Sequence, residues 1–411
     1  MFKKNLISCL LGLLAVIPLA AFSEAKPANR IVVVPTCLIK HSAIHYQTLT
    51  TKDYLTLISV NEEGIMQLAD AKHHQAQPCG GFMDVTADWN AYKAKRVTGK
   101  NTAGEFLDIY LIPKKVSVPD PNYTIKYQTQ VNQLLKQINS TNIWSNLTTL
   151  SNFENRYAKS QTGEATAFWL NTQVKRIAKA NNRKDVTTYF VNTDGYLQPS
   201  LVVKIGNSSE PGIVIGAHMD SFARNSEGKP SERQPGADDD GSGTVTILEA
   251  ARTLLASGMT FKKPLYFIWY AAEEKGLVGS GYVVKDFLNK KIPVSAVAQF
   301  DMTGFAYKND PTLWLLGDNV NQNLTSYLET LIKTYVKQPV GYTKCGYGCS
   351  DHFSWNQQGF AAAAPFEATF ETYNKNIHST QDTMDKLSLT HMIDFTKLAV
   401  AFAVELAEPI A

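Results

Sequence analysis

Short apolar runs alternate with amphipathic segments over the second half of the 411-residue chain, and this alternation limits the folds open to it. Gly212–Ala217 and Leu265–Ala271 are almost wholly apolar and too short for helices, which is typical of strands buried on both faces. Thr244–Leu255, between them, has the spacing of a helix with one apolar face. Strands that alternate with helices predict an α/β fold, a three-layer sandwich in which helices flank a mostly parallel central sheet.

The same patterns place the other elements of this region. We predict strands at Asp185–Val191, Leu201–Ile205, Gly212–Ala217, Leu265–Ala271, Ala296–Met302 and Gly359–Pro365. We predict helices at Val131–Ile138, Ala165–Ala178, Thr244–Leu255, Val278–Leu288, Asn321–Tyr335 and Leu389–Leu406. In such sheets, functional sites form at the carboxyl ends of the strands.

The first 25 residues have the composition of a secretory signal peptide. Lys3 and Lys4 form a basic start, Leu6–Ala21 is almost wholly apolar, and small residues follow. The apolar run is 16 residues long and is interrupted by Pro18, whereas a helix that crosses a bilayer needs about 20 residues. We therefore expect signal-peptide removal and secretion, to the periplasm or outside the cell, with no membrane anchor.

Residues 26–115 differ from the rest of the chain because they have no dense group of catalytic residue types. Their strand-like runs are Ile31–Val34, Tyr54–Val60 and Phe106–Ile112. The sequence VSVPDPN follows, and its proline, aspartate and asparagine residues are typical of a linker. We predict a small N-terminal domain (26–115), a linker (116–124) and a main domain (125–411).

The composition excludes several classes of protein. The chain is 44% hydrophobic and 19% charged, which is ordinary for a globular protein and excludes a disordered or collagen-like chain. Its formal net charge is only +3, and it has no stripe of lysine and arginine interleaved with aromatic residues. We therefore expect no nucleic-acid partner.

Four cysteines remain once the signal peptide, with Cys9, is removed. An even number of cysteines in an exported protein indicates disulfide bonds. Cys345 and Cys349 are most simply bonded to each other, and Cys37 then pairs with Cys79. The alternative for the close pair is a zinc knuckle, but that site needs two further ligands and the spacing is a poor match.

Chemically active residues follow the predicted strands at their carboxyl ends. They are His218 with Asp220, the aspartates 238–240, Glu273 with Glu274, Asp301, and, near the C-terminus, His378 with Asp382. Each has an ordinary explanation when it is taken alone, since an aspartate can cap a helix, a glutamate can begin one and a histidine can be a satisfied core residue. Their recurrence at successive strand ends instead indicates a site for two metal ions with mixed histidine and carboxylate ligands.

The number of ligands fits two zinc ions. Two histidines and three carboxylates, one of them bridging, give each metal three protein contacts and leave a position for water, as a catalytic site requires. Glu273 and Glu274 are adjacent, so their side chains diverge at a strand end. One of them can bind metal while the other acts on the water as a general base.

The motifs around these residues resemble those of the M28 family of zinc aminopeptidases, specifically its secreted bacterial leucyl aminopeptidase branch. The matching segments are IGAHMDS (215–221), PGADDDGSG (235–243), YAAEEKGLVGS (270–280), FDMTG (300–304), CGYGCSDH (345–352), PFEATFETYN (365–374) and IHSTQDT (377–383). The resemblance runs from about residue 125 to 408, in the family's order. It implies the zinc exopeptidase fold, two Zn²⁺ ions per chain, and the removal of N-terminal residues from peptides with a free N-terminus.

The resemblance also implies a role for each site residue. The implied ligands are His218 and Asp301 for one zinc, Glu274 and His378 for the other, and the bridging Asp239 for both. Glu273 would be the general base and then the general acid, acting on the metal-activated water. Tyr347 would donate a hydrogen bond to the tetrahedral oxyanion.

Two further aspartates have supporting roles by the same resemblance. Asp220 would accept the free ring N–H of His218, and Asp382 is a weaker candidate for the same task near His378. The peptide bond after Asp239 is cis in relatives, so we expect it to be cis here.

An apolar side-chain pocket is implied as well. Its walls would be Met302, Tyr347, Phe366, Phe370, Tyr373, Ile377 and the Cys345–Cys349 disulfide. Core packing is the alternative for some of these aromatic residues. Ala364 stands where some relatives carry a bulkier methionine, so we predict a somewhat more open pocket that accepts Leu, Met and aromatic residues.

Residues 26–115 match the place of a prosegment in this branch. We expect them to assist folding and to cover the site, as an intramolecular inhibitor, until a cut near Lys114 and Lys115. We also expect a monomer. Two alternatives stay open: another enzyme on the same fold, such as a single-zinc glutaminyl cyclase or a carboxypeptidase-like relative, and a non-catalytic ectodomain. A serine hydrolase is unsupported because no G-x-S-x-G sequence occurs.

Overall fold

The structure is a computed structural model. It describes residues 29–40, 44–71, 79–95, 102–112, 114, 123–224 and 231–410. The predicted signal peptide and residues 116–122 of the predicted linker lie outside these ranges. Within them, no helix is long and apolar enough to cross a membrane.

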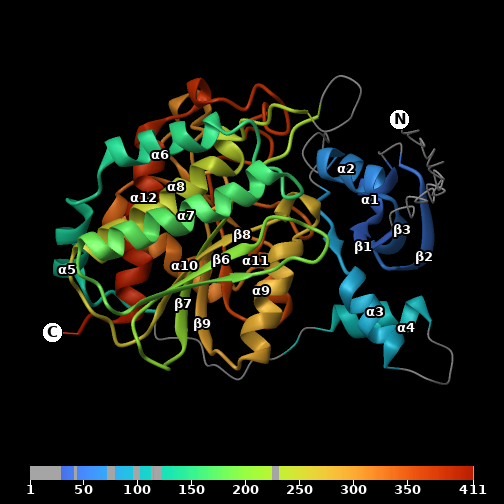
Figure 1. Cartoon of the computed structure of the whole chain (residues 1–411), viewed down its shortest axis with the longest axis horizontal. Coiled ribbons are helices and arrows are strands. Elements are labelled where there is room, and N and C mark those ends of the chain that lie inside the picture. Colours follow the sequence, from blue (N-terminus) through green and yellow to red (C-terminus); the bar gives the residue numbers. More distant parts are fainter. Residues whose placement is uncertain are drawn as a thin grey trace, which may run out of the picture.

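A mixed six-stranded sheet forms the centre of the larger domain in the described part of the chain (Figure 1). In spatial order its strands are β12 (Ala362–Ala363), β9 (Val294–Gln299), β7 (Gly212–His218), β8 (Leu265–Tyr270), β6 (Ser200–Ile205) and β5 (Val186–Val191). The first four run parallel to one another, whereas β6 and β5 are antiparallel to their neighbours. The prediction of a mostly parallel sheet is therefore confirmed, with an antiparallel edge.

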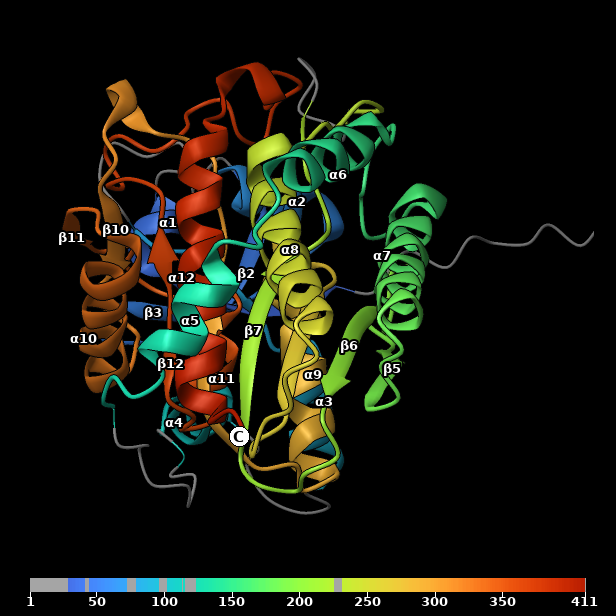
Figure 2. The same cartoon turned by 90° about the vertical axis from the view of Figure 1, so that its left-hand side faces the viewer.

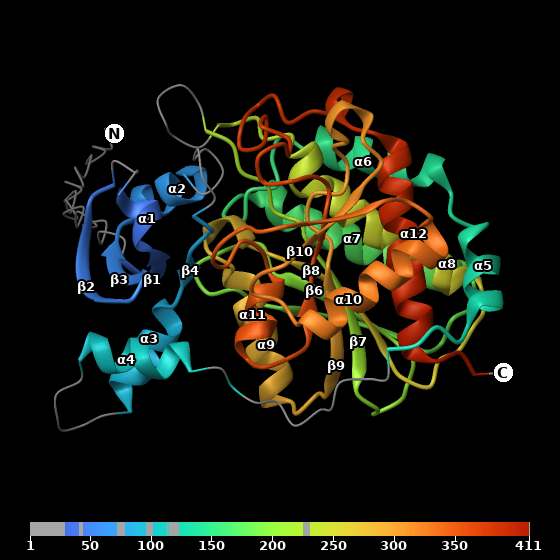
Figure 3. The same ribbon diagram turned by 180° about the vertical axis from the view of Figure 1, so that it is seen from behind.

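Helices cover both faces of this sheet because its strands are apolar on both sides. Ile213 and Ile215 face one layer and Val214 faces the other, as expected for a strand with a period of two. One layer contains α5 (Gln128–Leu135), α7 (Gln161–Ala180), α8 (Gly243–Ala256), α10 (Gln322–Leu331) and α12 (Leu389–Ala407) (Figure 2). The other contains α9 (Val278–Asn289) and α11 (His352–Gln357) (Figure 3).

The structure adds elements that the sequence did not predict. Helix α6 (Ser140–Asn152) packs on α8 and α12 through Leu147 and Leu150. A second, three-stranded sheet contains β10 (Leu313–Leu316), β11 (Val340–Thr343) and β13 (Pro365–Phe366). The strand predicted at Gly359–Pro365 is present only as the two-residue pieces β12 and β13, which belong to different sheets.

The N-terminal region has its own antiparallel sheet, to the right in Figure 1. In spatial order its strands are β2 (Tyr46–Lys52), β3 (Leu55–Val60), β1 (Arg30–Pro35) and β4 (Met83–Asp84). Its helices are α1 (Thr36–Lys40), α2 (Glu62–Ala71), α3 (Thr86–Ala94) and α4 (Ala103–Leu111). We call residues 29–112 of this region the N-terminal domain.

The strand predicted at Phe106–Ile112 is wrong, because helix α4 occupies most of this range. Oγ1 of Thr102 accepts a hydrogen bond from the backbone N–H of Glu105 at 3.1 Å, which caps the first turn. Phe106 and Tyr110 then lie one turn apart, and Phe106 packs edge-on against Trp89 of α3 with ring centroids 5.1 Å apart. In so short a run, an alternating pattern and a helical pattern are difficult to tell apart.

The apolar cores of the N-terminal domain continue into the larger domain. On one face of the small sheet, Phe222 packs in a cluster with Leu68 and Phe82. On the other face, Leu277, Tyr347 and Phe353 join a cluster that the N-terminal domain otherwise supplies. The contact between the two domains therefore buries apolar surface of the kind found in protein interiors.

Two disulfide bonds and one buried carboxylate fix the loops and the start of the main domain. The bonds Cys37–Cys79 and Cys345–Cys349 are those predicted. Glu405 of α12 accepts the backbone N–H groups of Lys126 at 2.8 Å and Tyr127 at 3.1 Å, and the hydroxyl of Tyr335 also donates to it. This carboxylate is 3% exposed, so it anchors the chain immediately before α5.

Candidate metal centre

The carboxyl ends of the central parallel strands bring five predicted side chains together. They are His218 at the end of β7, Asp239 in the turn before α8, Glu274 in the 3₁₀ turn after β8, Asp301 after β9, and His378 in the loop before α12. All except Asp301 are buried. Because parallel strands end at one edge of a sheet, segments that are far apart in sequence meet here.

Asp239 lies between the two histidines. Nε2 of His218 is 3.0 Å from Oδ1 of Asp239, and Nε2 of His378 is 3.2 Å from Oδ2 of the same carboxylate. Nε2 of His218 is also 3.5 Å from Oδ1 of Asp301, and Nε2 of His378 is 2.9 Å from Oε1 of Glu274. Each histidine therefore has its own carboxylate and shares Asp239 with the other.

The donor atoms fit divalent cations. In the described residues two groups could each hold a metal ion, His218 with Asp240 and Asp301, and Asp239 with Glu274 and His378. Within each group the ligand atoms lie within 4.8 Å of one another. Imidazole and carboxylate groups together suit zinc and similar metals.

The electrostatics of the site agree with that fit. Burial acts to lower the pKa of His218, but the charge of Asp301 and hydrogen bonds to Asp220 and Asp239 raise this pKa well above its usual value. Burial acts to raise the pKa of Asp239, but hydrogen bonds from His218 and His378 hold this pKa well below its usual value. The site therefore stabilises positive charge in its interior, as cation binding requires.

The three consecutive aspartates have three different sets of partners. Asp240 accepts the backbone N–H groups of His218 at 3.1 Å, Gly243 at 2.8 Å and Met302 at 3.1 Å, so its carboxylate is used by the backbone. Asp238 accepts from the N–H of Gly304 and from Nδ2 of Asn374. Only Asp239 faces both histidines, and the peptide bond between Asp239 and Asp240 is cis, as the family resemblance implied.

Asp220 supports both the histidine and the glutamates. Its Oδ1 lies 3.4 Å from Nδ1 of His218, the ring nitrogen that faces away from Asp239. The same carboxylate accepts the backbone N–H groups of Glu273 at 3.0 Å and Glu274 at 3.3 Å. Glu273 is 1% exposed. One aspartate thus orients a candidate ligand and the turn that carries the predicted base.

Asp382 supports the candidate bridging residue. Its two carboxylate oxygens accept the backbone N–H groups of Asp238 at 3.0 Å and Asp239 at 3.1 Å. The sequence suggested a task at the ring of His378, whereas these contacts fix the backbone that carries Asp239.

The structure places Tyr347 in the contact between the two domains. Its hydroxyl donates to Sδ of Met83 at 3.8 Å, and its ring packs edge-on against Phe353 with centroids 4.6 Å apart. Burial raises its pKa well above the usual value for tyrosine. The predicted oxyanion donor is therefore in contact with the N-terminal domain.

A small apolar cavity adjoins Asp239 and Asp301. Its lining includes the predicted pocket residues Met302, Phe366 and Phe370, together with Ala364, Cys349, Ser350, Leu316 and Pro365. The rings of Phe366 and Phe370 are stacked with centroids 4.9 Å apart. Tyr373 and Ile377, also predicted, pack in the apolar cluster that surrounds this cavity. The volume is about 20 Å³, which is room for a single water molecule, so a substrate side chain requires the pocket to widen.

Arg156 is a site residue for which the sequence predicted no role. Its side chain is fully buried, and its guanidinium donates to the carbonyl oxygens of Met219 at 3.0 Å, Pro235 at 2.7 Å and Gly236 at 2.7 Å. It therefore joins the segment after His218 to the segment before Asp239. The available signal was weak: Arg156 lies within residues 125–408, over which the sequence resembles the family.

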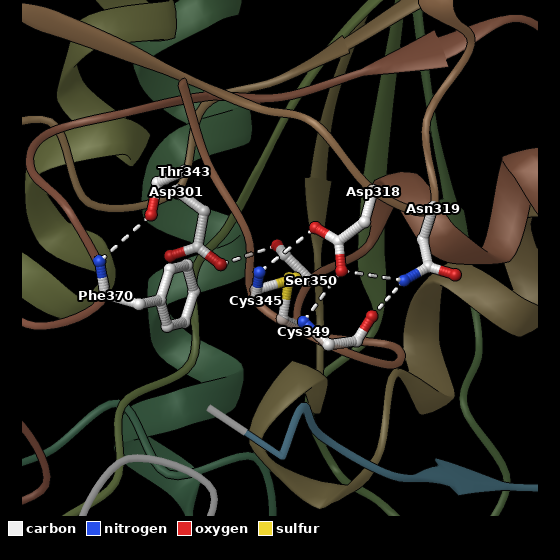
Figure 4. Close-up of a disulfide and its surroundings, with 9 residues drawn as sticks. Asp301, Asp318, Asn319, Thr343, Cys345, Cys349, Ser350 and Phe370 are labelled. Carbon is white, nitrogen blue, oxygen red and sulfur yellow. Dashed lines mark hydrogen bonds between the residues drawn. A yellow bond between two sulfur atoms is a disulfide. The ribbon is translucent and has the colours of Figure 1, made fainter. Parts of the chain in front are cut away.

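Ser350 is a second such residue. Its Oγ donates to Oδ2 of Asp301 at 2.5 Å, and Figure 4 shows it between that carboxylate and the disulfide. The disulfide loop is held in turn by Asp318, which accepts the backbone N–H groups of Cys345 at 3.1 Å and Gly346 at 2.8 Å. The position of Ser350 directly after Cys349 was the available signal.

Comparison with known proteins identifies the family. The sequence model of peptidase family M28 matches residues 200–403. Leucine aminopeptidase 1 of Aspergillus fumigatus is 37% identical over 298 residues, which cover 69% of this chain and 75% of that protein. A probable leucine aminopeptidase of Trichophyton verrucosum is 33% identical over 341 residues, covering 82% and 87%.

Two solved structures are similar over almost the whole chain. The crystal structure of the LapA aminopeptidase of Legionella pneumophila has a TM-score of 0.83 and 42% identity, covering 94% of this chain and all of that one. The crystal structure of LapB from the same organism has a TM-score of 0.81 and 38% identity, covering 92% and all of that chain. This chain therefore belongs to peptidase family M28 and is a leucine aminopeptidase-like metallopeptidase.

Proposed function

We propose that this chain is a secreted di-zinc aminopeptidase, synthesised as a zymogen, that removes N-terminal Leu, Met or aromatic residues from peptides. The observation that carries the proposal is the position of Asp239, whose two carboxylate oxygens lie 3.0 and 3.2 Å from the two histidines. A carboxylate in that position can bridge two cations. The relatives named leucine aminopeptidases support the reaction class.

The five converging side chains would hold the metals. His218 and Asp301 would bind one Zn²⁺, Glu274 and His378 the other, and Asp239 both. When bound, zinc supplies a water of lowered pKa and polarises the substrate carbonyl. Asp220 keeps His218 in the tautomer that leaves Nε2 free for a metal.

Glu273 would move the proton. Its carboxylate takes a proton from the attacking water and later delivers it to the nitrogen of the leaving amine. The backbone of Glu273 is held by Asp220 at 3.0 Å, so the side chain starts from a fixed position. The free α-amine of the substrate would bind beside the carboxylates of the site, which restricts cleavage to the first residue.

The pocket lining predicts how selectivity changes with side-chain volume. Ala364 lines the cavity next to Phe366 and Met302, so the Ala364→Met variant narrows the space for the substrate side chain. We expect kcat/KM for phenylalanine p-nitroanilide to fall about tenfold relative to leucine p-nitroanilide, since a pocket discriminates by one to three kcal/mol per added methylene, or about 10–200-fold. Steady-state rates on the two anilides check this. An unchanged ratio would show that Ala364 does not limit the pocket.

Backbone hydrogen bonds between the N-terminal domain and two loops beside the site support the proposal that the uncleaved chain is a zymogen. Asp84 donates its N–H to the carbonyl of Gly276 at 3.0 Å, and the N–H of Gly81 donates to the carbonyl of Tyr347. Figure 4 shows the blue N-terminal segment passing beside the disulfide loop. The N-terminal domain therefore contacts both the turn after Glu274 and the loop that carries Tyr347. Removal after a cut near Lys114 and Lys115 would free both; Lys115 lies outside the described residues.

A glycine in this contact provides a test of latency. A Cβ atom at Gly81 would lie 2.4 Å from the carbonyl oxygen of Gly348, so Gly81→Ala forces the two segments apart. We expect the uncleaved variant to hydrolyse leucine p-nitroanilide at least tenfold faster than the uncleaved parent. The matched control is Gly104→Ala, where the nearest atom is 3.8 Å away, and it should stay as latent as the parent. Equal activity of all three uncleaved proteins would argue against inhibition by the N-terminal domain.

The reaction itself is tested with leucine p-nitroanilide, free and N-acetylated, before and after treatment with a zinc chelator. We expect hydrolysis of the free form only, its loss with chelator, and its return with Zn²⁺. Elemental analysis should find two zinc ions per chain. One zinc would favour a cyclase, and no hydrolysis of either substrate by the cleaved protein would favour a non-catalytic role.

A further inference from the structure

Lys275 is a buried cation that the proposed mechanism does not use. The residue is 1% exposed, and its Nζ has no hydrogen-bond partner among the described residues. Burial of an ammonium group without a partner is costly. The covered state therefore leaves the hydrogen-bonding capacity of this ammonium group unused.

Two aromatic rings and the N-terminal domain enclose the ammonium group. Nζ of Lys275 lies 4.3 Å from the ring centroid of Phe222 and 4.7 Å from that of Tyr157, within the range of a cation–π contact. Both rings pack in the apolar cluster that includes Phe82 of the N-terminal domain. Phe82 also covers the next residue, Gly276, where a Cβ atom would lie 2.7 Å from its ring. The N-terminal domain thus covers Lys275, Phe222 and Tyr157.

This group lies beside the metal centre, away from the apolar cavity. Lys275 directly follows Glu274, and the ring of Phe222 meets the ring of His378 edge-on with centroids 5.2 Å apart. The cavity is on the side of Asp301, and Asp239 lies between that side and His378. A peptide whose first side chain enters the cavity would extend its later residues across Asp239 toward Lys275.

The charges across the domain contact indicate what the uncovered surface binds. Among the described residues, the ion pairs that cross it are Lys159–Glu62 at 2.8 Å, Arg224–Asp70 at 2.9 Å and Lys285–Asp88 at 2.9 Å. In all three the acid belongs to the N-terminal domain and the base to the larger domain. Burial lowers the pKa of Lys275 to about 8, and the negative charge of Glu62 acts in the opposite direction. The N-terminal domain therefore presents carboxylates to this surface.

On the basis of the aminopeptidase function proposed above, we propose that Lys275, Phe222 and Tyr157 form a carboxylate-binding subsite for the residue after the scissile bond, opened when the N-terminal domain leaves. The ammonium group would make a charge-assisted hydrogen bond to the carboxylate, and the two rings would form the wall beside it. The carboxylate is either the C-terminus of a dipeptide or the side chain of an acidic second residue. The enzyme then favours dipeptides or peptides with Asp or Glu in second position.

The test compares matched substrates. The protein is expressed as the full chain, cut in the linker, and then separated from its N-terminal domain. Leu-Gly against Leu-Gly-amide reports on a C-terminal carboxylate, and Leu-Asp-amide against Leu-Asn-amide reports on a side-chain carboxylate. We expect kcat/KM to be about tenfold higher for the carboxylate member of at least one pair, as a hydrogen bond to a charged group predicts. In Lys275→Met that ratio should fall to about one, and in Lys275→Arg it should be retained.

The outcomes separate the subsite from the reaction. If the unsubstituted protein hydrolyses leucine p-nitroanilide but prefers neither carboxylate, or if Lys275→Met keeps the preference, the subsite is refuted and the aminopeptidase stands. If leucine p-nitroanilide is not hydrolysed at all, the proposed function fails first. The control is Lys290→Met, which removes a lysine that also lies over a ring, Tyr189, at 4.0 Å, but pairs with Asp286 on the surface. It should keep the parent ratio.

Thermal unfolding of the uncleaved chain gives a second readout. Methionine has nearly the length of lysine and suits the apolar surroundings of Phe222 and Tyr157. Lys275→Met should therefore raise the melting temperature of the uncleaved protein, because a buried group without a hydrogen-bond partner is removed. A lower melting temperature would show that the lysine stabilises the covered state, and would contradict its assignment to substrate.

Discussion

Glu273→Gln should lower kcat by about 10²–10⁴-fold, the usual contribution of a general acid–base group, while the protein keeps both metal ions. The amide has nearly the volume of the carboxylate but cannot accept the proton of the water. The backbone contact of Glu273 with Asp220 does not depend on the side chain, so the turn should keep its position. Rates on leucine p-nitroanilide and elemental analysis of the same sample check both parts of this expectation.

The adjacent residue provides the matched control. Glu274→Gln makes the same chemical change one position further along, but Oε1 of Glu274 lies 2.9 Å from Nε2 of His378 in the candidate metal group. This variant should lose activity together with bound zinc, in contrast to Glu273→Gln. If Glu273→Gln lost zinc and Glu274→Gln kept it, the two roles would have to be exchanged.

Replacing Arg156 with methionine should lower the free energy of unfolding by about 3–5 kcal/mol, the usual cost of breaking a buried charged network. Four carbonyl groups, those of Leu150, Met219, Pro235 and Gly236, lose their guanidinium donor, and a buried polar group without a partner costs about 1–3 kcal/mol. The carboxylates near Arg156, including Asp220 and Asp239, also lose a positive charge. Urea denaturation of the uncleaved protein measures the effect.

Arg176→Met is the control for that change. Arg176 is exposed on α7, and Nη2 contacts Oε1 of Gln173 one turn away. Its replacement should change the free energy of unfolding by less than about 0.5 kcal/mol, as is usual for surface sites. Equal urea midpoints for the two variants would mean that Arg156 does not hold the two segments together.

The buried strands and amphipathic helices of the main domain could be predicted from the sequence. The strands β7, β8 and β9 and the helices α8, α9 and α12 follow from apolar runs and helical spacing that local chemistry determines. The N-terminal domain was less predictable. Its helix α4 is fixed by a cap at Thr102 and by packing on Trp89, and a short apolar run does not reveal either contact.

The candidate site likewise has features that the sequence predicts and features that it does not. Residue types at the strand ends sufficed to predict that two histidines and several carboxylates meet at one place, because parallel strands end at one edge. The choice of Asp239 among the three aspartates, and of Glu274 rather than Glu273 as a ligand, came from the family resemblance. The partners of Asp382 and Arg156 are backbone groups. Because almost every residue carries the same backbone groups, the residue types do not identify these partners. The position of Tyr347 against Met83 depends on the docking of another domain, so no local pattern predicts it.

The anchor at Glu405 has a consequence for the zymogen that we proposed above. Helices α4 and α5 lie at opposite sides of the molecule in Figure 1, and Glu405 fixes the chain just before α5, so the residues between these helices tether the two domains to each other only through the covalent chain. While the tether is intact, the two domains meet at the high effective concentration of an intramolecular reaction. Once it is cut, their association depends on the protein concentration in solution. For the secreted zymogen proposed above, dilution would then complete the separation that the cut begins, and a concentrated sample of cut enzyme would stay partly latent.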